Sequence, residues 1–261
     1  MQHRVLPMTG IHNFRDYGNY PAADGARVKA GRLWRSGQHI DATAQDLERV
    51  SALGLSKVID LRGDSEREKY PCARPEDFAA EVLFFAGETA GLGGQAVHEE
   101  AGAGIVTADD AHRAMVRLYQ GMAWRPILVG TYRLYFDALA AGAEPSLLHC
   151  LAGKDRTGLA VALAHHVLGV HADDAMSDYL LTNEAGNIDA RIEAGAKTIR
   201  ASHGEAIEDD AVRTLMSVDP AFLEEGLGAI RERHGSLDAY LDEVLGVSPE
   251  KAAAIRANYL A

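Results

Sequence analysis

The chain is poor in cysteine and has no long apolar run, and each shortage excludes a class of protein. Its 261 residues contain two cysteines, Cys72 and Cys150, without the spacing of metal ligands, so neither a disulfide framework nor a zinc site is expected. No apolar run approaches the roughly 20 residues that a membrane-spanning helix needs. The opening residues, MQHRVLPMTG, lack the hydrophobic segment of a cleaved signal peptide. We therefore expect a cytoplasmic protein outside the membrane, with secretion without a cleaved signal peptide as the open alternative.

Positive charge is also scarce. Lysine and arginine total 26 against 38 aspartate and glutamate residues, which gives a formal net charge of -12 at pH 7. Such a charge disfavours long-range attraction to nucleic acid, so no nucleic-acid partner is expected and an anionic ligand must be captured locally. The eleven histidines are scattered along the chain, so neither a metal nor another cofactor is expected. The sequence does not determine the oligomeric state.

Short apolar runs alternate with helical patterns in the first 150 residues, which indicates an α/β fold. The expected strands are residues 32–38, a short strand that ends in a turn, and the buried runs 57–63, 81–87 and 146–150. Amphipathic helices are expected over 43–54, where Thr43 and Asp46 form a variant of the capping box, and over 107–120 and 126–141. From residue 157 onward nearly every segment has a helical pattern. The sequence therefore predicts a central, largely parallel sheet flanked by helices, with an extended helical C-terminal half.

We expect one domain over residues 1–261, because the composition is that of an ordinary globular protein without repeats. Residues 87–104 are rich in glycine and lack a periodic pattern, so we interpret them as a mobile loop, either an active-site lid or a surface insertion. Residues 185–261 are interpreted as a helical extension that could serve as a lid, a dimer surface or a scaffold.

The stretch HCLAGKDRTG, residues 149–158, lies between an expected buried strand and an expected helix that starts near Arg156 or Thr157. The first amides of a helix have no internal partner and face outward with the positive end of the helix dipole, so a phosphate-sized anion can bind there. A thiol in such a place loses its proton more easily. Cys150 is therefore a candidate nucleophile beside an anion site.

The residues that follow Cys150 fit a loop that wraps around a phosphate. Arg156 lies six positions on, where its planar guanidinium can bind two phosphate oxygens. Gly153 permits the sharp turn that close backbone approach requires. Thr157 can direct its hydroxyl toward the sulfur, and His149 is expected to orient the loop. The backbone amides of the intervening residues, Leu151 and Ala152 among them, complete the expected binding site.

The pattern H-C-x5-R-[ST] resembles the phosphate-binding loop of the cysteine-based protein tyrosine phosphatase superfamily. The form HCxxGKDRTG, with Lys-Asp directly before the arginine, is similar to the loop of the atypical bacterial tyrosine and phosphoinositide phosphatases. The way its residues would work together is similar to that in myotubularin-type lipid phosphatases. The segments GIHNFRDYGNY, GRLWRSGQ, VIDLRGDSE and DYLLTNE also resemble that bacterial family, in its order, so the resemblance spans residues 9–184. By background usage the pattern H-C-x-x-G-x-x-R-[ST]-G should occur by chance in on the order of one chain in 10⁵ of this length.

The resemblance implies a metal-independent phosphatase with a phosphocysteine intermediate on Cys150. Arg156 and the loop amides would bind the phosphoryl oxygens. The implied partners are phosphotyrosine proteins first, with phosphoserine, phosphothreonine and phosphoinositides as further candidates. The alternative is a phosphate- or phosphoinositide-binding module that has lost turnover.

Two aspartates are candidates for the acid that protonates the leaving oxygen. Asp155 lies inside the loop, where the likeness to myotubularins implies this role, although it could instead hold Arg156. Asp60 ends an expected strand and matches an aspartate of the bacterial family, although it could instead bind loop amides or Arg62. The sequence leaves the choice open.

Lys154 adds a second cation to the loop. It could bind an additional phosphate of a phosphoinositide headgroup, or it could be an exposed, solubilising residue. The net charge of -12 opposes residence on an anionic membrane, so the breadth of substrates is undecided.

Several polar residues outside the loop are interpreted as supports. Asn13, Arg15 and Asp16 are expected to tie the N-terminal segment to the sheet. Arg35 and Ser36 could form a buried ion pair and a turn or support the loop. Arg62 is expected to pair with Asp60 or Glu66. The residues expected to brace the loop from behind are Asp178, Tyr179 and Asn183. Cys72 is interpreted as an ordinary loop thiol, with a protective disulfide to Cys150 as the alternative.

Two other classes of protein have loops that are similar in part. A nucleotide-binding P-loop requires serine or threonine after the lysine, and Asp155 stands there. A sulfurtransferase also uses a loop cysteine, but Arg156 followed by Thr157, together with the available acids, favours phosphate ester chemistry.

Overall fold

A computed structural model describes residues 4–89, 105–187, 189, 192–193, 200 and 206–261. Its centre is a five-stranded sheet in the order β1-β2-β5-β3-β4. The strands are β1 (Arg15–Asp16), β2 (Leu33–Ser36), β3 (Lys57–Asp60), β4 (Glu81–Leu83) and β5 (Ser146–His149). Strands β2, β5, β3 and β4 are parallel, and β1 pairs with β2 in the antiparallel direction. The predicted α/β fold with a largely parallel sheet is confirmed.

The register of the three central strands brings their carboxyl ends together. Ser36 at the end of β2 pairs with His149 at the end of β5, and His149 pairs with Asp60 at the end of β3. Loops that leave this edge therefore start side by side, although they are far apart in the sequence. In open α/β sheets, this edge is where ligands bind.

The other elements of the described chain are helices. They are α1 (Ala44–Ser51), α2 (Asp64–Lys69), α4 (Ala108–Met122), α5 (Pro126–Ala141), α6 (Asp155–Val167), α7 (Ala172–Leu180), α8 (Thr182–Ala185), α10 (Asp209–Met216), α11 (Pro220–His234), α12 (Leu237–Glu243) and α13 (Pro249–Tyr259), with a 3-10 turn at Ala23–Gly25. The capping box of Thr43 and Asp46 begins α1 as predicted. Helix α2 was not predicted, because it is a short helix of six residues without an apolar side chain.

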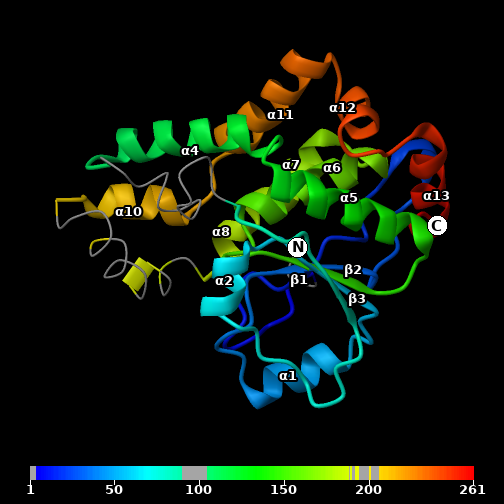
Figure 1. Cartoon of the computed structure of the whole chain (residues 1–261), viewed down its shortest axis with the longest axis horizontal. Helices are drawn as coiled ribbons and strands as arrows, with labels where there is room; N and C mark the ends of the chain where they lie inside the picture. Colours follow the sequence, from blue (N-terminus) through cyan, green and yellow to red (C-terminus); the bar gives the residue numbers. More distant parts are fainter. Residues whose placement is uncertain (1–3, 90–104, 188, 190–191, 194–199, 201–205) are drawn as a thin grey trace.

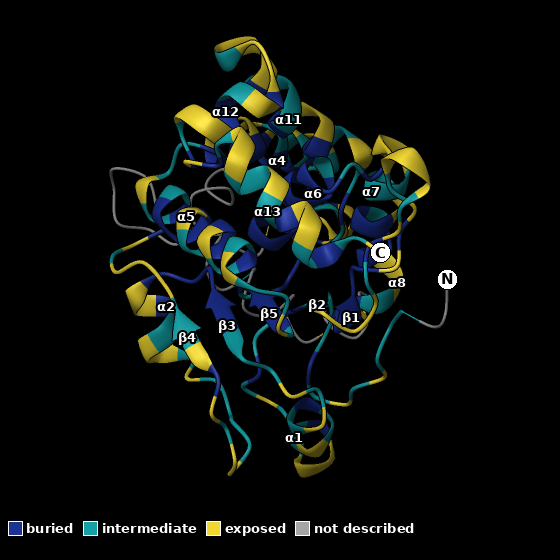
Figure 2. Ribbon diagram, turned by 90° about the vertical axis from the view of Figure 1, so that its right-hand side faces the viewer, coloured by how far each residue is buried: buried dark blue, intermediate teal, exposed yellow. Residues whose placement is uncertain are grey.

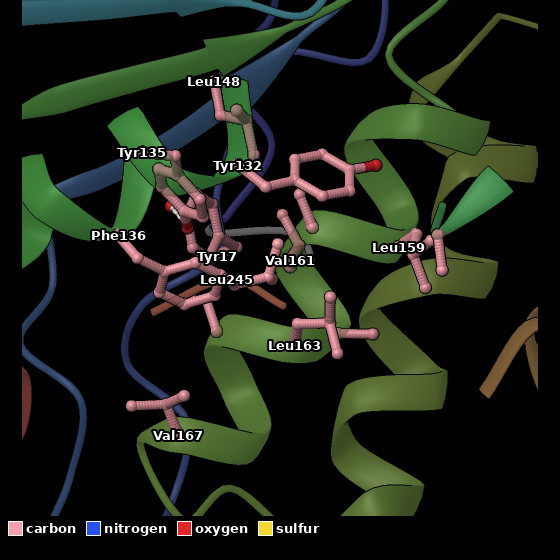
Figure 3. Packing of buried hydrophobic residues seen from close by; sticks show 14 of the residues in the cluster. Tyr17, Tyr132, Tyr135, Phe136, Leu148, Leu159, Val161, Leu163, Val167 and Leu245 are labelled. Carbon is pink, nitrogen blue, oxygen red and sulfur yellow. Dashed lines mark hydrogen bonds between the residues drawn. The ribbon is translucent and has the colours of Figure 1, made fainter. Parts of the chain in front are cut away.

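The helices cover the two faces of the sheet unequally. Helix α1 lies on one face, and most of the others lie on the opposite face (Figures 1 and 2). Alternate strand residues point to opposite faces, so Val58 and Leu147 pack in the cluster beside α1, whereas Ile59 and Leu148 join the main core. Figure 3 shows aromatic side chains of α5, including Tyr132, beside aliphatic side chains of α6.

The C-terminal helices share the main core with the sheet. Their buried contributors to that cluster are Phe222, Leu223, Ile230, Leu237, Tyr240, Leu241, Leu245, Val247, Ile255 and Tyr259. The segment that we expected to be an extension therefore packs directly against α5 and α6. Most of the expected glycine-rich loop at 87–104 and part of the expected helical C-terminal half, between residues 188 and 205, lie outside the described residues.

Within the described ranges, no helix combines the length and apolar character needed to cross a membrane.

Candidate active site

The loop after β5 connects the carboxyl edge of the sheet to the start of α6. Strand β5 ends at His149, and α6 begins at Asp155, so Cys150 follows the strand directly. Cys150 is buried, with 2% of its surface exposed. Gly153 has a φ of 67°, and a Cβ atom at this position would lie 2.3 Å from the carbonyl oxygen of Ser36. Only glycine fits that turn without displacing β2, as the sequence predicted.

Three consecutive amides in this loop are available to an anion. The backbone N–H groups of Leu151, Ala152 and Gly153 have no hydrogen-bond partner among the described residues. Ala152 and Gly153 are buried, and a buried N–H group without a partner costs free energy. Helix α6 starts two residues after Gly153, with 13 residues and therefore a substantial dipole. An oxyanion at this position would satisfy the amides and face the positive end of the helix.

Arg156 is held by a carboxylate that the sequence did not assign to it. Glu66 accepts hydrogen bonds from Nη1 of Arg156 at 2.5 Å and from Nη2 at 2.9 Å. Oε2 of Glu66 also accepts the amide of Gly63 and the hydroxyl of Thr89. This two-pronged pair fixes the plane of the guanidinium.

The pair with Glu66 leaves one edge of the Arg156 guanidinium for a ligand. The other N–H of Nη1 faces the carbonyl oxygen of Leu61 at 3.3 Å, whereas Nε has no partner among the described residues. Nε–H and the second N–H of Nη2 lie on one side of the planar group, a spacing that suits two phosphate oxygens. Burial alone would lower the pKa of Arg156, but Glu66 and then Cys150 raise it above its ordinary value.

The sequence contained little to identify Glu66. We expected it as a possible partner of Arg62, which is four residues away, and not of a residue 90 positions along the chain. The signal available was its place at the third position of α2, where its carboxylate caps the helix by accepting the Gly63 amide.

The carbonyl of Gly153 is held from behind by two donors. Nδ2 of Asn13 donates to it at 2.7 Å, and Nη2 of Arg35 donates to it at 2.8 Å. Nη1 of Arg35 pairs with Oδ2 of Asp178 at 2.7 Å, and Nε of Arg15 pairs with Oδ1 of the same carboxylate at 3.2 Å. Of the expected supports, Asn13, Arg15, Arg35 and Asp178 therefore meet behind the loop, whereas Asn183 pairs with the backbone of Val218.

Asp155 and Lys154 form a buried pair at the start of α6. Oδ1 of Asp155 accepts from Nζ of Lys154 at 3.0 Å and from the hydroxyl of Tyr119 at 2.9 Å. The Tyr119 hydroxyl lies 2.8 Å from that of Tyr179. Nζ of Lys154 also donates to the carbonyl of Ser217, and 1% of the lysine is exposed. The interpretation of Lys154 as an exposed residue is therefore wrong, because its ammonium is enclosed by the protein.

Asp60 forms a buried ion pair with Arg62, which is one of the alternatives that the sequence left open. Its carboxylate accepts from Nε and Nη2 of Arg62, the latter at 2.7 Å, and Nε2 of His149 lies 3.7 Å away. Burial opposes the charge of Asp60, but His149 and then Arg62 hold the pKa of its carboxyl well below its usual range, so the carboxyl is ionised at neutral pH.

The remaining predicted residues lie next to the loop. Oγ1 of Thr157 is buried without a hydrogen-bond partner among the described residues, so the expected bond to the sulfur is not formed here. Nδ1 of His149 faces the carbonyl of Cys150 at 3.4 Å. Cys72 is half-buried, and its sulfur accepts the amide of His39. In the described part of the chain, His, Cys, Asp and Glu side chains do not gather in threes that could hold a metal ion.

Buried neutral histidines make the fold sensitive to acid. Burial lowers the pKa of His149 from 6.5 to about 4, with Asp60 opposing the shift, and burial lowers the pKa of His39 and His165 as well. Each ring binds a proton more readily in the unfolded chain, so its stabilising effect is present above pH 6.5 and is lost as the pH falls through the folded value. His149 alone is expected to account for at most about 3 kcal/mol.

Denaturant unfolding at pH 7 and at pH 4.5 would measure this loss. The ion pairs of Asp60 and Asp178 act in the same direction at still lower pH, because the pKa of each carboxyl is depressed in the folded state. An unfolding free energy that does not change between these two pH values would contradict the prediction.

Comparison with known proteins identifies the family. A family model described as the tyrosine phosphatase family matches residues 6–261 and so includes the C-terminal helices. A protein of Cupriavidus necator, named as a tyrosine-protein phosphatase in a form that marks the assignment as provisional, is 34% identical over 260 residues, covering 98% of this chain and 88% of its own. The triple specificity protein phosphatase PtpB of Mycobacterium tuberculosis is 28% identical over 272 residues, covering 94% and 95%.

A solved structure, TpbA of P. aeruginosa, is 17% identical and covers 71% of this chain and 86% of its own. Its TM-score of 0.30 is too low to establish a shared fold. The family model, which spans nearly the whole chain, and the Cupriavidus relative are sufficient without it. The chain belongs to the tyrosine phosphatase family and is an enzyme of that kind.

Proposed function

We propose that the protein hydrolyses phosphotyrosine monoesters without a metal ion, through a phosphocysteine intermediate on Cys150. The observation that supports this most directly is the row of partnerless amides at Leu151, Ala152 and Gly153, which follows a buried cysteine and leads into a helix N-terminus. Nucleophile, anion site and proton donor are then all supplied by side chains and backbone of this chain.

In the first step, the Cys150 thiolate attacks phosphorus in line with the ester oxygen. A sulfur–phosphorus bond forms, the bond from phosphorus to the ester oxygen breaks, and that oxygen takes a proton from an acid. The Nε and Nη2 edge of Arg156 and the loop amides bind the nonbridging oxygens, which gather charge in the transition state. Glu66 keeps the guanidinium in place, so no reorientation is needed during the reaction.

In the second step, water attacks phosphorus and the bond to sulfur breaks. The acid of the first step, now a carboxylate, takes a proton from the water, and inorganic phosphate leaves with the thiolate restored. The same residue therefore acts once as an acid and once as a base.

Asp155 is our candidate for that residue. Lys154 and Tyr119 both donate to its Oδ1, and a proton on Oδ2 leaves both of those hydrogen bonds intact. Asp60 is not proposed, because its carboxylate is ionised in a buried pair with Arg62. Tyr119 and Tyr179 would then orient the acid.

For substrates, we propose phosphotyrosine proteins first and test phosphoserine, phosphothreonine and phosphoinositides beside them. The name of the Mycobacterium tuberculosis relative refers to three specificities, which supports a broad panel. Lys154 is weaker support for phosphoinositide substrates in the structure than it was in the sequence alone, because Asp155 and the carbonyl of Ser217 hold its ammonium.

The test is phosphate release in EDTA over this panel, combined with acid quenching and mass spectrometry of the digested protein. We expect turnover of phosphotyrosine peptides in EDTA and a phosphorylated peptide that contains Cys150. Turnover that requires added metal, or an adduct on another residue, would contradict the mechanism. Binding of phosphorylated ligands with no turnover of any would instead support the inactive binding module.

A further inference from the structure

Two of the cations that surround the loop lie in neutral pairs. Arg156 pairs with Glu66, and Arg62 pairs with Asp60. Each pair cancels its own charge at short range, so these groups alone supply little net attraction for a phosphate dianion. The chain as a whole, with its net charge of -12, repels one.

The cluster behind Gly153 is different, because it contains two arginines and one carboxylate. The side chains of Arg15, Arg35 and Asp178 are each 0% exposed. Asp178 binds both guanidinium groups, and among the described residues no second carboxylate is hydrogen-bonded to either arginine. Asp16, next to Arg15 on β1, also carries a carboxylate. That carboxylate accepts the amides of Gly18 and Gly31 and no hydrogen bond from Arg15 or Arg35.

This cluster therefore has a surplus of one positive charge inside the protein. The pKa of Arg15 is lowered to about 10, first by burial and then by Arg35, with Asp178 opposing the shift, so Arg15 is charged at neutral pH. The surplus adjoins the loop directly, since Arg35 donates to the carbonyl of Gly153. A charge in the protein interior is little screened by salt and acts over a longer range than one in water.

The arrangement is unfavourable for stability. The attraction within a buried ion pair seldom offsets the free energy lost when the charges leave water, and a surplus charge offsets even less of it. Nε of Arg35 is also buried without a hydrogen-bond partner among the described residues, which adds a further penalty. A brace that only held the loop would be better built from neutral groups, as Asn13 shows by donating to the same carbonyl.

We propose that Arg35 is an electrostatic positioning residue, and that the surplus charge of the Arg15, Arg35 and Asp178 cluster strengthens binding of the phosphoryl group at the loop. The inference rests on the proposed phosphate site. Arg35 does not touch the substrate. It acts on phosphoryl binding through its hydrogen bond to the Gly153 carbonyl and through its charge.

Two substitutions in this cluster distinguish an effect of its charge on anion binding from an effect of its contacts with the loop. Arg35→Met removes one positive charge, and Asp178→Asn removes the negative one, yet both break the same buried ion pair. If the cluster only braces the loop, both changes weaken anion binding. If its surplus charge matters, Arg35→Met weakens binding and Asp178→Asn does not.

The experiment measures the dissociation constants of tungstate and inorganic phosphate by isothermal titration calorimetry. All variants are made in the full chain carrying Cys150→Ser, so that differences in sulfur ionisation do not contribute. We expect Arg35→Met to weaken binding by about tenfold or more, because a unit charge several ångströms away in a protein interior has an effect of that order. Arg35→Lys, which keeps the charge, is expected to remain within about threefold of the parent.

Thermal melting and circular dichroism show which variants are folded. If Asp178→Asn does not fold, the comparison of Arg35→Met with Arg35→Lys decides the question, because the two differ in charge at the same position. Equal weakening in these two variants, or no weakening in either, would overturn the inference.

Arg156→Met in the same background separates this inference from the proposed function. If it binds the oxyanions as tightly as the parent, the phosphate site itself is wrong. If it loses binding while Arg35→Met and Arg35→Lys bind the oxyanions equally well, the phosphate site is supported and only the proposed role of Arg35 is contradicted.

Discussion

Replacing Cys150 with serine is expected to lower the turnover of phosphotyrosine by on the order of 10⁴- to 10⁶-fold, the range that loss of a catalytic nucleophile produces in other hydrolases. A serine hydroxyl at this position is a far weaker nucleophile than a thiolate. The same variant should still bind phosphorylated ligands, because the amides of Leu151, Ala152 and Gly153 and the Arg156 guanidinium are unchanged. Steady-state kinetics and calorimetry on the same preparation would measure both effects.

The chain offers a matched control in its second cysteine. Cys72 is half-buried, and its sulfur accepts a single amide hydrogen bond, from His39. Cys72→Ser should therefore retain turnover close to that of the wild type. Substantial activity in the Cys150→Ser protein, or equal losses in both variants, would show that Cys150 is not the nucleophile.

Replacing Asp155 with asparagine is expected to reduce kcat by roughly 10²- to 10⁴-fold, the usual contribution of a general acid. The loss should be large for phosphotyrosine, whose leaving oxygen needs a proton, and small for an aryl phosphate whose leaving group is already stable as an anion. The limb of the pH–rate profile that reports loss of the acid's proton should also disappear. Asparagine keeps an oxygen that can accept from Tyr119 and Lys154, but it removes the charge of the buried pair with Lys154, so thermal melting must show that the variant is folded.

Asp60→Asn is the control for this experiment, since it neutralises the other candidate. Removing the charge leaves Arg62 buried without its carboxylate, a change that typically destabilises a protein by about 3 kcal/mol. Its melting temperature should therefore fall, while its pH–rate profile keeps the shape of the wild type. If the leaving-group dependence and the altered profile occur in Asp60→Asn and not in Asp155→Asn, our assignment of the acid is wrong.

Features that depend on neighbours in the sequence were predictable. The capping box of Thr43 and Asp46, the helices α4 and α5, and the strand that leads into Cys150 all follow from local spacing and apolar periodicity. The need for glycine at position 153 was also local, because a tight turn in a short loop requires a backbone with positive φ.

The contacts that prepare the site for an anion were not predictable in the same way. Arg156 meets Glu66 across 90 positions of the chain, and Asn13 meets the carbonyl of Gly153 across 140. Asn13, Arg35 and Asp178 were candidate supports, but no pattern in the sequence states which carbonyl they would hold. Tyr119 was not predicted at all, because a tyrosine on the apolar face of a helix has the same spacing as a core residue.

The sequence by itself determined the chemistry: a cysteine, a flexible turn and an arginine at fixed separation between a strand and a helix, which a local backbone geometry is sufficient to bring together. The tertiary structure decided which carboxylate does what. The register of β3 and β5 sets Asp60 beside His149, and the packing of α2 and α4 sets Glu66 on Arg156 and Tyr119 on Asp155. A charged group's role depends on its partner and its burial, and both are properties of the folded chain.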